Sequence, residues 1–71
     1  MNTKELKIEM LRHGDSGNTL SEALGMTSAS FSKKINAKDA EFTQGEISAI
    51  VERYNLSAER LVEIFFAKEI S

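Results

Sequence analysis

Residues 16–36 of the chain read SGNTLSEALGMTSASFSKKIN. Leu20 and Leu24 lie four positions apart, which is the spacing of one face of a helix. Gly25 supplies the positive φ that ends a helix without steric cost. A turn of about three residues follows before the next helix begins, a length that sets two helices at roughly 90 to 120°. The segment therefore predicts a helix-turn-helix.

The starts of three helices are marked by one recurring arrangement. A capping hydroxyl is flanked by an apolar residue before it and by another four positions into the helix, which is the hydrophobic staple. Thr43 shows it and adds Glu46 in a capping box, and Thr27 and Ser57 repeat the staple. Helices are therefore expected to start near residues 28, 44 and 58. The first helix is expected to start after Asn2 or Thr3 and to end near His13 and Gly14. The second is expected to start after Asp15 or Ser16, and the fourth to end at Asn55.

Apolar residues at helical spacing predict a core with a contribution from every helix. With no proline and no alternating strand pattern, residues 1–71 are expected to form a single all-α domain, a compact five-helix bundle. The expected core residues are Leu6, Met10 and Leu11, with Ile8 as a second contact, then Leu20 and Leu24, Phe31 and Ile35, Ile47, Ile50, Val51 and Tyr54, and finally Leu61, Ile64 and Phe65.

Composition argues against several classes of function. The chain has no cysteine, so no disulfide or thiolate metal site is expected. No apolar run approaches the ~18 residues that span a bilayer, and the cytoplasm of a bacterial host is the expected location. A single histidine and no glycine-rich phosphate loop predict no enzyme, no cofactor and no small-molecule substrate. Glu9 and His13 are four apart, but two ligands do not make a metal site, and a solvated pair is expected.

Charge is distributed unevenly along the sequence. The net charge is −2, which argues against indiscriminate binding to phosphate. Residues 26–38 nevertheless contain Lys33, Lys34 and Lys38 and no acid. One short basic segment therefore lies in an acidic protein.

This basic segment contains the second helix of the motif, which enters the major groove in helix-turn-helix proteins. Phe31 and Ile35 are expected to face the core. Hydroxyls and lysines on the outer side can donate to phosphates or to base edges of a double-stranded operator. The alternative is a surface helix that only keeps the protein in solution. By elimination the outward residues are Ser28, Ala29, Ser30, Ser32, Lys33 and Lys34.

The order of leucines, helix caps and apolar helix faces along the chain resembles the phage-type Cro and repressor family of small regulators. This family belongs to the XRE-like, lambda-repressor-like DNA-binding proteins. The resemblance rests on Leu20, Ser21, Leu24, Gly25 and the segments FSKKIN (31–36), EFTQGEI (41–47) and LSAERLVEIFF (56–66). It implies a five-helix fold, operator binding, commonly as a homodimer, and transcriptional control in a phage or a bacterial mobile element. Position by position it implies base-facing roles for Ser28, Ala29, Ser30 and Ser32, a flanking position for Lys33 and Lys34, and a loop position beside the DNA backbone for Lys38.

Three positions depart from the family pattern. Gly17 stands where relatives often have a glutamine that bonds a phosphate, Ala29 where they often have a long polar side chain, and Ala37 where a glycine is usual. A helix-turn-helix domain with few polar side chains to recognise bases, and with negative net charge, suggests an alternative function. It could be an antirepressor that binds a partner repressor protein instead of DNA.

The end of the chain offers a second candidate surface. Adjacent residues of a helix point about 100° apart, so a small core can hardly bury both Phe65 and Phe66. Either both pack at the edge of the core, or Val62, Phe66 and Ile70 form a dimer or partner surface, since an exposed apolar patch usually marks an interface.

Overall fold

The computed structural model describes residues 1–36 and 42–66, and the part of the chain that it describes is helical without any strand. Two predicted residues, Lys38 and Ile70, lie outside this range, as does Ala37. The elements are α1 (Thr3–Arg12), α2 (Gly17–Ala23), α3 (Ser28–Asn36), α4 (Gln44–Tyr54), α5 (Ala58–Leu61) and a π-helical segment η1 (Val62–Phe66).

The helix boundaries agree closely with the capping residues of the sequence. Thr43 and Glu46 form the predicted capping box of α4, and Ser57 caps α5. The Thr27 hydroxyl accepts from the backbone N–H of Ser30 at the start of α3. Of the two candidates for the start of α2, Ser16 is the cap. Asn2 caps α1, and left-handed backbone at Gly14, Gly25 and Asn55 follows α1, α2 and α4.

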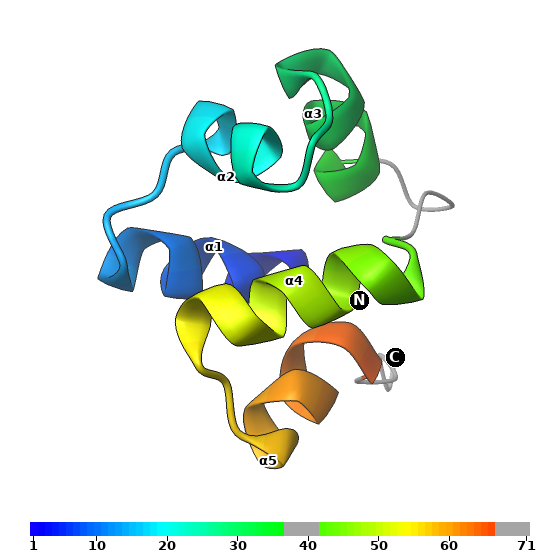
Figure 1. Cartoon of the computed structure of the whole chain (residues 1–71). Helices are drawn as coiled ribbons and strands as arrows, with labels where there is room; N and C mark the ends of the chain where they lie inside the picture. Colours follow the sequence, from blue (N-terminus) through cyan, green and yellow to red (C-terminus); the bar gives the residue numbers. More distant parts are fainter. Residues whose placement is uncertain (37–41, 67–71) are drawn as a thin grey trace.

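The helices form three layers, with α1 and α4 in the middle (Figure 1). The pair α2 and α3 covers one side of this middle layer, and α5 with η1 covers the other. Leu6, Leu20, Ile50 and Ile64 are fully buried, and they come from four different elements. Phe31 and Ile35 of α3 belong to the same core cluster. Burial of a large apolar side chain contributes roughly 1.5–3 kcal/mol, so this shared core holds α3 in position.

One predicted core residue is wrong. Leu11 is 81% exposed, because it lies about 100° around α1 from Met10 and so leaves the face that begins at Leu6. Glu9 occupies that face instead, buried at 4% exposure, so the solvated Glu9–His13 pair is also wrong. The Glu9 carboxylate accepts from the Arg60 guanidinium at 2.7 Å. The remaining predicted core residues are buried or partly buried: Ile8, Leu24, Ile47, Val51 and Leu61 are in the second group.

Ion pairs of Arg60 and of Asp15 connect segments of the chain that are far apart in the sequence. Arg60 also donates to Glu5 at 2.7 Å, and these hydrogen bonds to Glu5 and Glu9 raise the pKa of Arg60. Asp15, in the link between α1 and α2, accepts two hydrogen bonds from the Arg53 guanidinium and one from the Tyr54 hydroxyl. The C-terminal end of α4 is therefore tied to the link after α1, and α5 is tied to α1 itself.

The last helix differs from expectation in its geometry. The sequence predicts a continuous α-helix from residue 58, but residues 62–66 form a π-helix. Ile64 and Phe65 are buried there, while Phe66 is 61% exposed, so Phe65 and Phe66 do not both pack at the edge of the core. Among the described residues, no helix is long and apolar enough to cross a membrane.

Candidate nucleic-acid interface

Helix α3 is anchored on one side only. Phe31 and Ile35 are buried at 3% and 7% exposure, and the Phe31 ring contacts the Phe42 ring with centroids 5.8 Å apart. The Thr3 hydroxyl also donates to the Ile35 carbonyl at 3.2 Å, which attaches the C-terminal end of α3 to α1. The opposite side is open: Ser28, Ala29, Ser30, Ser32 and Lys33 are exposed.

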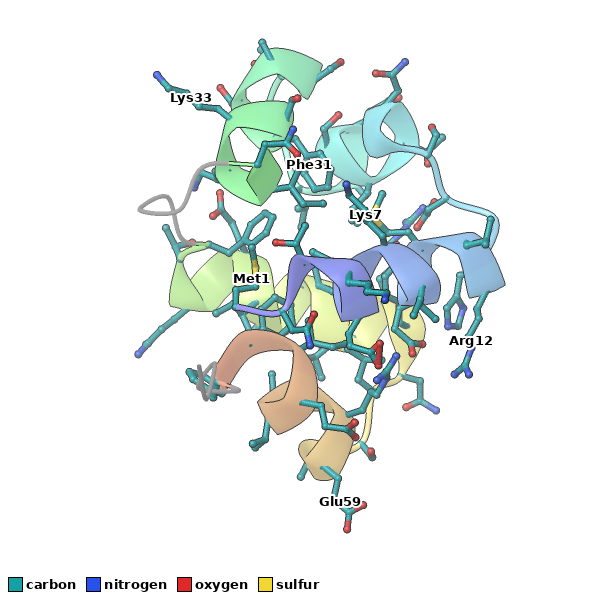
Figure 2. The ribbon with its side chains drawn as sticks, turned by 180° about the vertical axis from the view of Figure 1, so that it is seen from behind. Met1, Lys7, Arg12, Phe31, Lys33 and Glu59 are labelled. Atoms are coloured by element: carbon teal, nitrogen blue, oxygen red, sulfur yellow. The ribbon has the colours of Figure 1, made fainter. Side chains whose placement is uncertain are left out.

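The exposed side of α3 has a definite centre. Helical residues advance by about 100°, so Lys33 lies about 200° from Phe31, and Ala29 lies one turn before Lys33 on the same line. Figure 2 shows Lys33 projecting away from the body of the molecule. Ser32 and Ser30 lie on the two sides of this line. The most prominent polar group of α3 is therefore the Lys33 ammonium.

Lys34 does not lie on this open surface. Its Nζ donates to the Glu46 carboxylate at 2.7 Å, and its side chain is 25% exposed. The same Nζ lies 5.9 Å from the centre of the Phe42 ring. Spacing within α3 predicts an outward position for Lys34, because only Phe31 and Ile35 are expected to face the core. That spacing does not reveal that Glu46 at the start of α4 lies beside this flank of α3. Lys34 thus joins α3 to α4.

Glu46 is held in its charged form by this pairing. Burial alone would raise the pKa of Glu46, but hydrogen bonds from Lys34 and from the Thr43 backbone lower it overall. The carboxylate accepts from Lys34 Nζ and from the Thr43 amide at once. The Glu46 carboxylate is therefore used within the fold.

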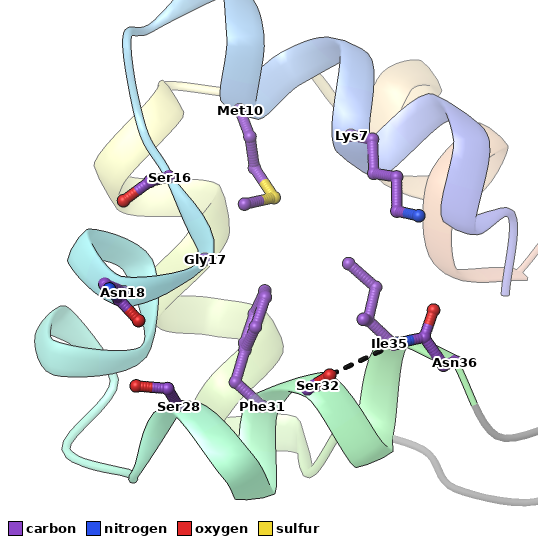
Figure 3. A pocket seen from close by; sticks show the side chains of 10 residues that line it. All are labelled: Lys7, Met10, Ser16, Gly17, Asn18, Ser28, Phe31, Ser32, Ile35 and Asn36. Atoms are coloured by element: carbon purple, nitrogen blue, oxygen red, sulfur yellow. Dashed lines mark hydrogen bonds between the residues drawn. The ribbon is translucent and has the colours of Figure 1, made fainter.

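The short polar side chains of α3 are partly paired with each other. The Thr27 hydroxyl donates to the Ser30 hydroxyl at 3.0 Å, and the Asn36 amide donates to the Ser32 hydroxyl at 3.3 Å. Ser28 is exposed at the start of α3, next to the N-terminal end of α2 (Figure 3). A surface of this kind offers hydroxyl and amide donors around a single cation.

Three exposed polar residues beside this surface were missing from the predicted set: Lys7, Asn18 and Asn36. Asn36 follows Ser32 and Ser28 at intervals of four, so helical spacing alone could have placed it on their flank. Asn18 lies in the first turn of α2, directly after the conspicuous Gly17. No local pattern identifies Lys7, because its position depends on how α1 packs against α3.

The structure describes only part of the second predicted surface, the apolar patch at the end of the chain. Val62 and Phe66 are 53% and 61% exposed and lie four positions apart, and Ile70 falls outside the described residues. Phe66 borders a small hollow of about 100 Å³ that Met1, Ile47 and the edges of Phe42 and Phe65 also line. The described residues hold no group of three or more metal-ligating side chains.

Comparisons with known proteins do not assign the chain to a family. No model of a protein family matches the sequence, and neither the curated proteins nor the solved structures contain a match.

Proposed function

We propose that the protein is a sequence-specific DNA-binding transcriptional regulator that inserts α3 into the major groove of its operator. The observation that carries this proposal is the one-sided anchoring of α3. Its inner face is buried, and its outer face presents Ser28, Ser32 and Lys33 without an acidic residue. An α-helix with such a face fits the width of the major groove.

The connection between α2 and α3 supports the same function. Gly25 has a φ of 72°, and the Met26 amide donates to the Ser21 carbonyl, which closes a tight turn after α2. The turn takes the chain directly into α3 at Ser28. Two helices joined in this way form the helix-turn-helix, in which the first helix crosses the DNA backbone while the second enters the groove.

The chemistry of the exposed residues assigns their roles in this complex. Lys33 can reach the O6 and N7 acceptors of guanine or neutralise a phosphate, and serine hydroxyls can bond to either bases or phosphates. Ala29, on the same line as Lys33, can contact the methyl group of thymine. Lys34 contributes to the fold instead, through Glu46.

The exposed apolar residues of η1 support a homodimer. Val62 and Phe66 of η1 are both exposed and lie four positions apart, so they form one apolar strip. A two-fold dimer places two recognition helices on half-sites about 34 Å apart, one turn of DNA. The proposed partners are therefore an operator and a second copy of the chain.

The test is binding to the DNA upstream of the protein's own gene, followed by fluorescence anisotropy over a range of salt concentrations. Lys33→Ala should weaken binding and, where the ammonium contacts a phosphate, lower the slope of log K against log salt by roughly 0.9. Lys4→Ala is the matched control, since Lys4 is an exposed lysine that belongs to α1 and not to α3. Equal affinity and base preference for wild type and Lys33→Ala would show that α3 is not the recognition surface.

An antirepressor is the second candidate function. The observation in its favour is that Lys34 is neutralised, which leaves Lys33 as the exposed lysine of α3, while Glu52, Glu59 and Glu63 are exposed. Figure 2 shows Glu59 projecting at the end of the molecule opposite Lys33. Such a surface complements a basic repressor. This function requires that the protein alone does not shift the DNA and that it removes the neighbouring repressor from it.

A further inference from the structure

An open groove of about 450 Å³ lies between α1, the start of α2, and α3 (Figure 3). Met10 from α1 and Phe31 and Ile35 from α3 form its apolar floor. Gly17 contributes no side chain, which leaves the groove open at the N-terminal end of α2. The rim is polar and consists of Lys7, Ser16, Asn18, Ser28, Ser32 and Asn36.

The groove has the charge and the donors to accept an anion. Among the ten residues that line it, Lys7 is a cation and none is an acid. In Figure 3 the Lys7 side chain extends from α1 toward the Ile35 and Asn36 end of the groove. Two asparagine amides and three serine hydroxyls supply further donors around the rim.

The groove is also continuous with the proposed DNA-binding face. Ser28, Ser32 and Asn36 lie at intervals of four residues, so they form one flank of α3 that borders the groove. A duplex that lies on α3 therefore passes its backbone across the mouth of the groove. That backbone carries an anionic phosphate at every nucleotide, which matches a polar rim that contains a lysine and no acid.

We propose that one strand of the operator backbone lies across this groove, with a phosphate held by Lys7 and the Asn36 amide at one end of it. The inference rests on the proposed function and deepens it, because Lys7 lies outside the helix-turn-helix. Asn18, at the other end of the groove beside Gly17, would donate to another phosphate of the same strand. The surface that contacts DNA extends from α3 across to α1.

The experiment compares Lys7→Ala with Lys4→Ala, which removes a lysine one turn earlier on the same helix but outside the groove. Both proteins are titrated into the labelled duplex from upstream of the gene, at salt concentrations between about 50 and 200 mM. We expect Lys7→Ala to weaken binding by roughly 5-fold and to lower the salt slope by about 0.9, while Lys4→Ala retains the wild-type slope. Both variants should unfold like the wild type, because both side chains are exposed.

A second measurement identifies the source of the phosphate. In NMR titrations the side-chain amides of Asn18 and Asn36 should shift on addition of the duplex and not on addition of inorganic phosphate alone. Wild-type slopes for both lysine variants, or shifts with inorganic phosphate but none with the duplex, would overturn the groove proposal while leaving α3 as the recognition helix. Absence of duplex binding by the wild type would instead reject the proposed function itself.

Discussion

Asp15 shows how a single side chain can hold two parts of this small fold together. Its carboxylate is 7% exposed and accepts from Arg53 at 2.7 and 2.8 Å and from Tyr54 at 2.6 Å. The hydrogen bond from Arg53 is the main reason that the pKa of Asp15 lies well below its usual range. Burial, followed by the hydrogen bond to Asp15, raises the pKa of Tyr54, which therefore stays neutral as a donor.

This arrangement predicts how acid affects stability. The pKa of Asp15 is lower in the folded state than in the unfolded state, where it is about 3.9. Its contribution is therefore complete above about pH 4 and is lost as the pH falls toward the folded value. We expect Asp15→Asn to be less stable than the wild type at neutral pH and to lose less stability on acidification, as measured by urea unfolding near pH 7 and pH 3.

Glu52→Gln is the control for this prediction. It removes one carboxylate from an exposed position of α4, so its stability should follow the wild-type dependence on pH. The same acid-induced loss in Asp15→Asn as in the wild type would show that the Asp15 ion pair contributes nothing specific.

At the scale of the helices, the start of α4 combines two functions in one residue. Glu46 accepts from the Thr43 amide in the capping box and also from Lys34 of α3. The Thr43 hydroxyl accepts from the Glu46 amide at 3.2 Å in return. Capping of α4 and docking of α3 are therefore coupled at this point.

Removing the cap should weaken the whole fold. Thr43→Ala leaves an amide of the first turn unsatisfied, and we expect the free energy of unfolding to fall by about 1 kcal/mol. Ser48→Ala changes a hydroxyl residue at an exposed position within the same helix, where alanine is the better helix former, and should cause no loss. Denaturant unfolding of the two variants provides the measurement, and equal losses would contradict a specific role for the cap.

The same helices show what the sequence can and cannot predict. Caps are local, so Thr43, Ser57, Gly25 and Asn55 identify helix ends correctly from neighbouring residues alone. Pairings between helices are not local. Neither the Lys34–Glu46 bond nor the bond between Glu9 and Arg60 follows from the spacing within one helix. The exposure of Leu11 has the same cause, because burial depends on which helix covers which face.

For the molecule as a whole, one part of the candidate site follows from local helical spacing and another part depends on how the helices pack. Helical spacing around Phe31 and Ile35 correctly gives the exposure of Ser28, Ala29, Ser30, Ser32 and Lys33. The groove beside them could not be predicted, because it is lined by residues of α1, the start of α2 and α3 together. Sequence alone therefore identifies the helix that faces the solvent, and the packing of three helices identifies the groove next to it.

The apolar strip of η1 leads to a prediction about assembly. A dimer that buries Val62 and Phe66 should dissociate in Phe66→Ser, because a hydroxyl replaces the largest exposed apolar group of the strip. Since Phe66 is 61% exposed in the single chain, the substitution should change the stability of the monomer little. Leu11→Ser is the matched control, because Leu11 is 81% exposed but lies on α1, away from the strip.

Sedimentation equilibrium measures the outcome directly. We expect the wild type and Leu11→Ser to share a concentration-dependent mass that rises toward the dimer, and Phe66→Ser to remain at the monomer mass. Affinity for a duplex with two half-sites should fall in parallel, because a monomer engages only one of them. An unchanged mass in Phe66→Ser would remove η1 from the interface, and the two copies would then have to meet through another surface or bind the operator independently.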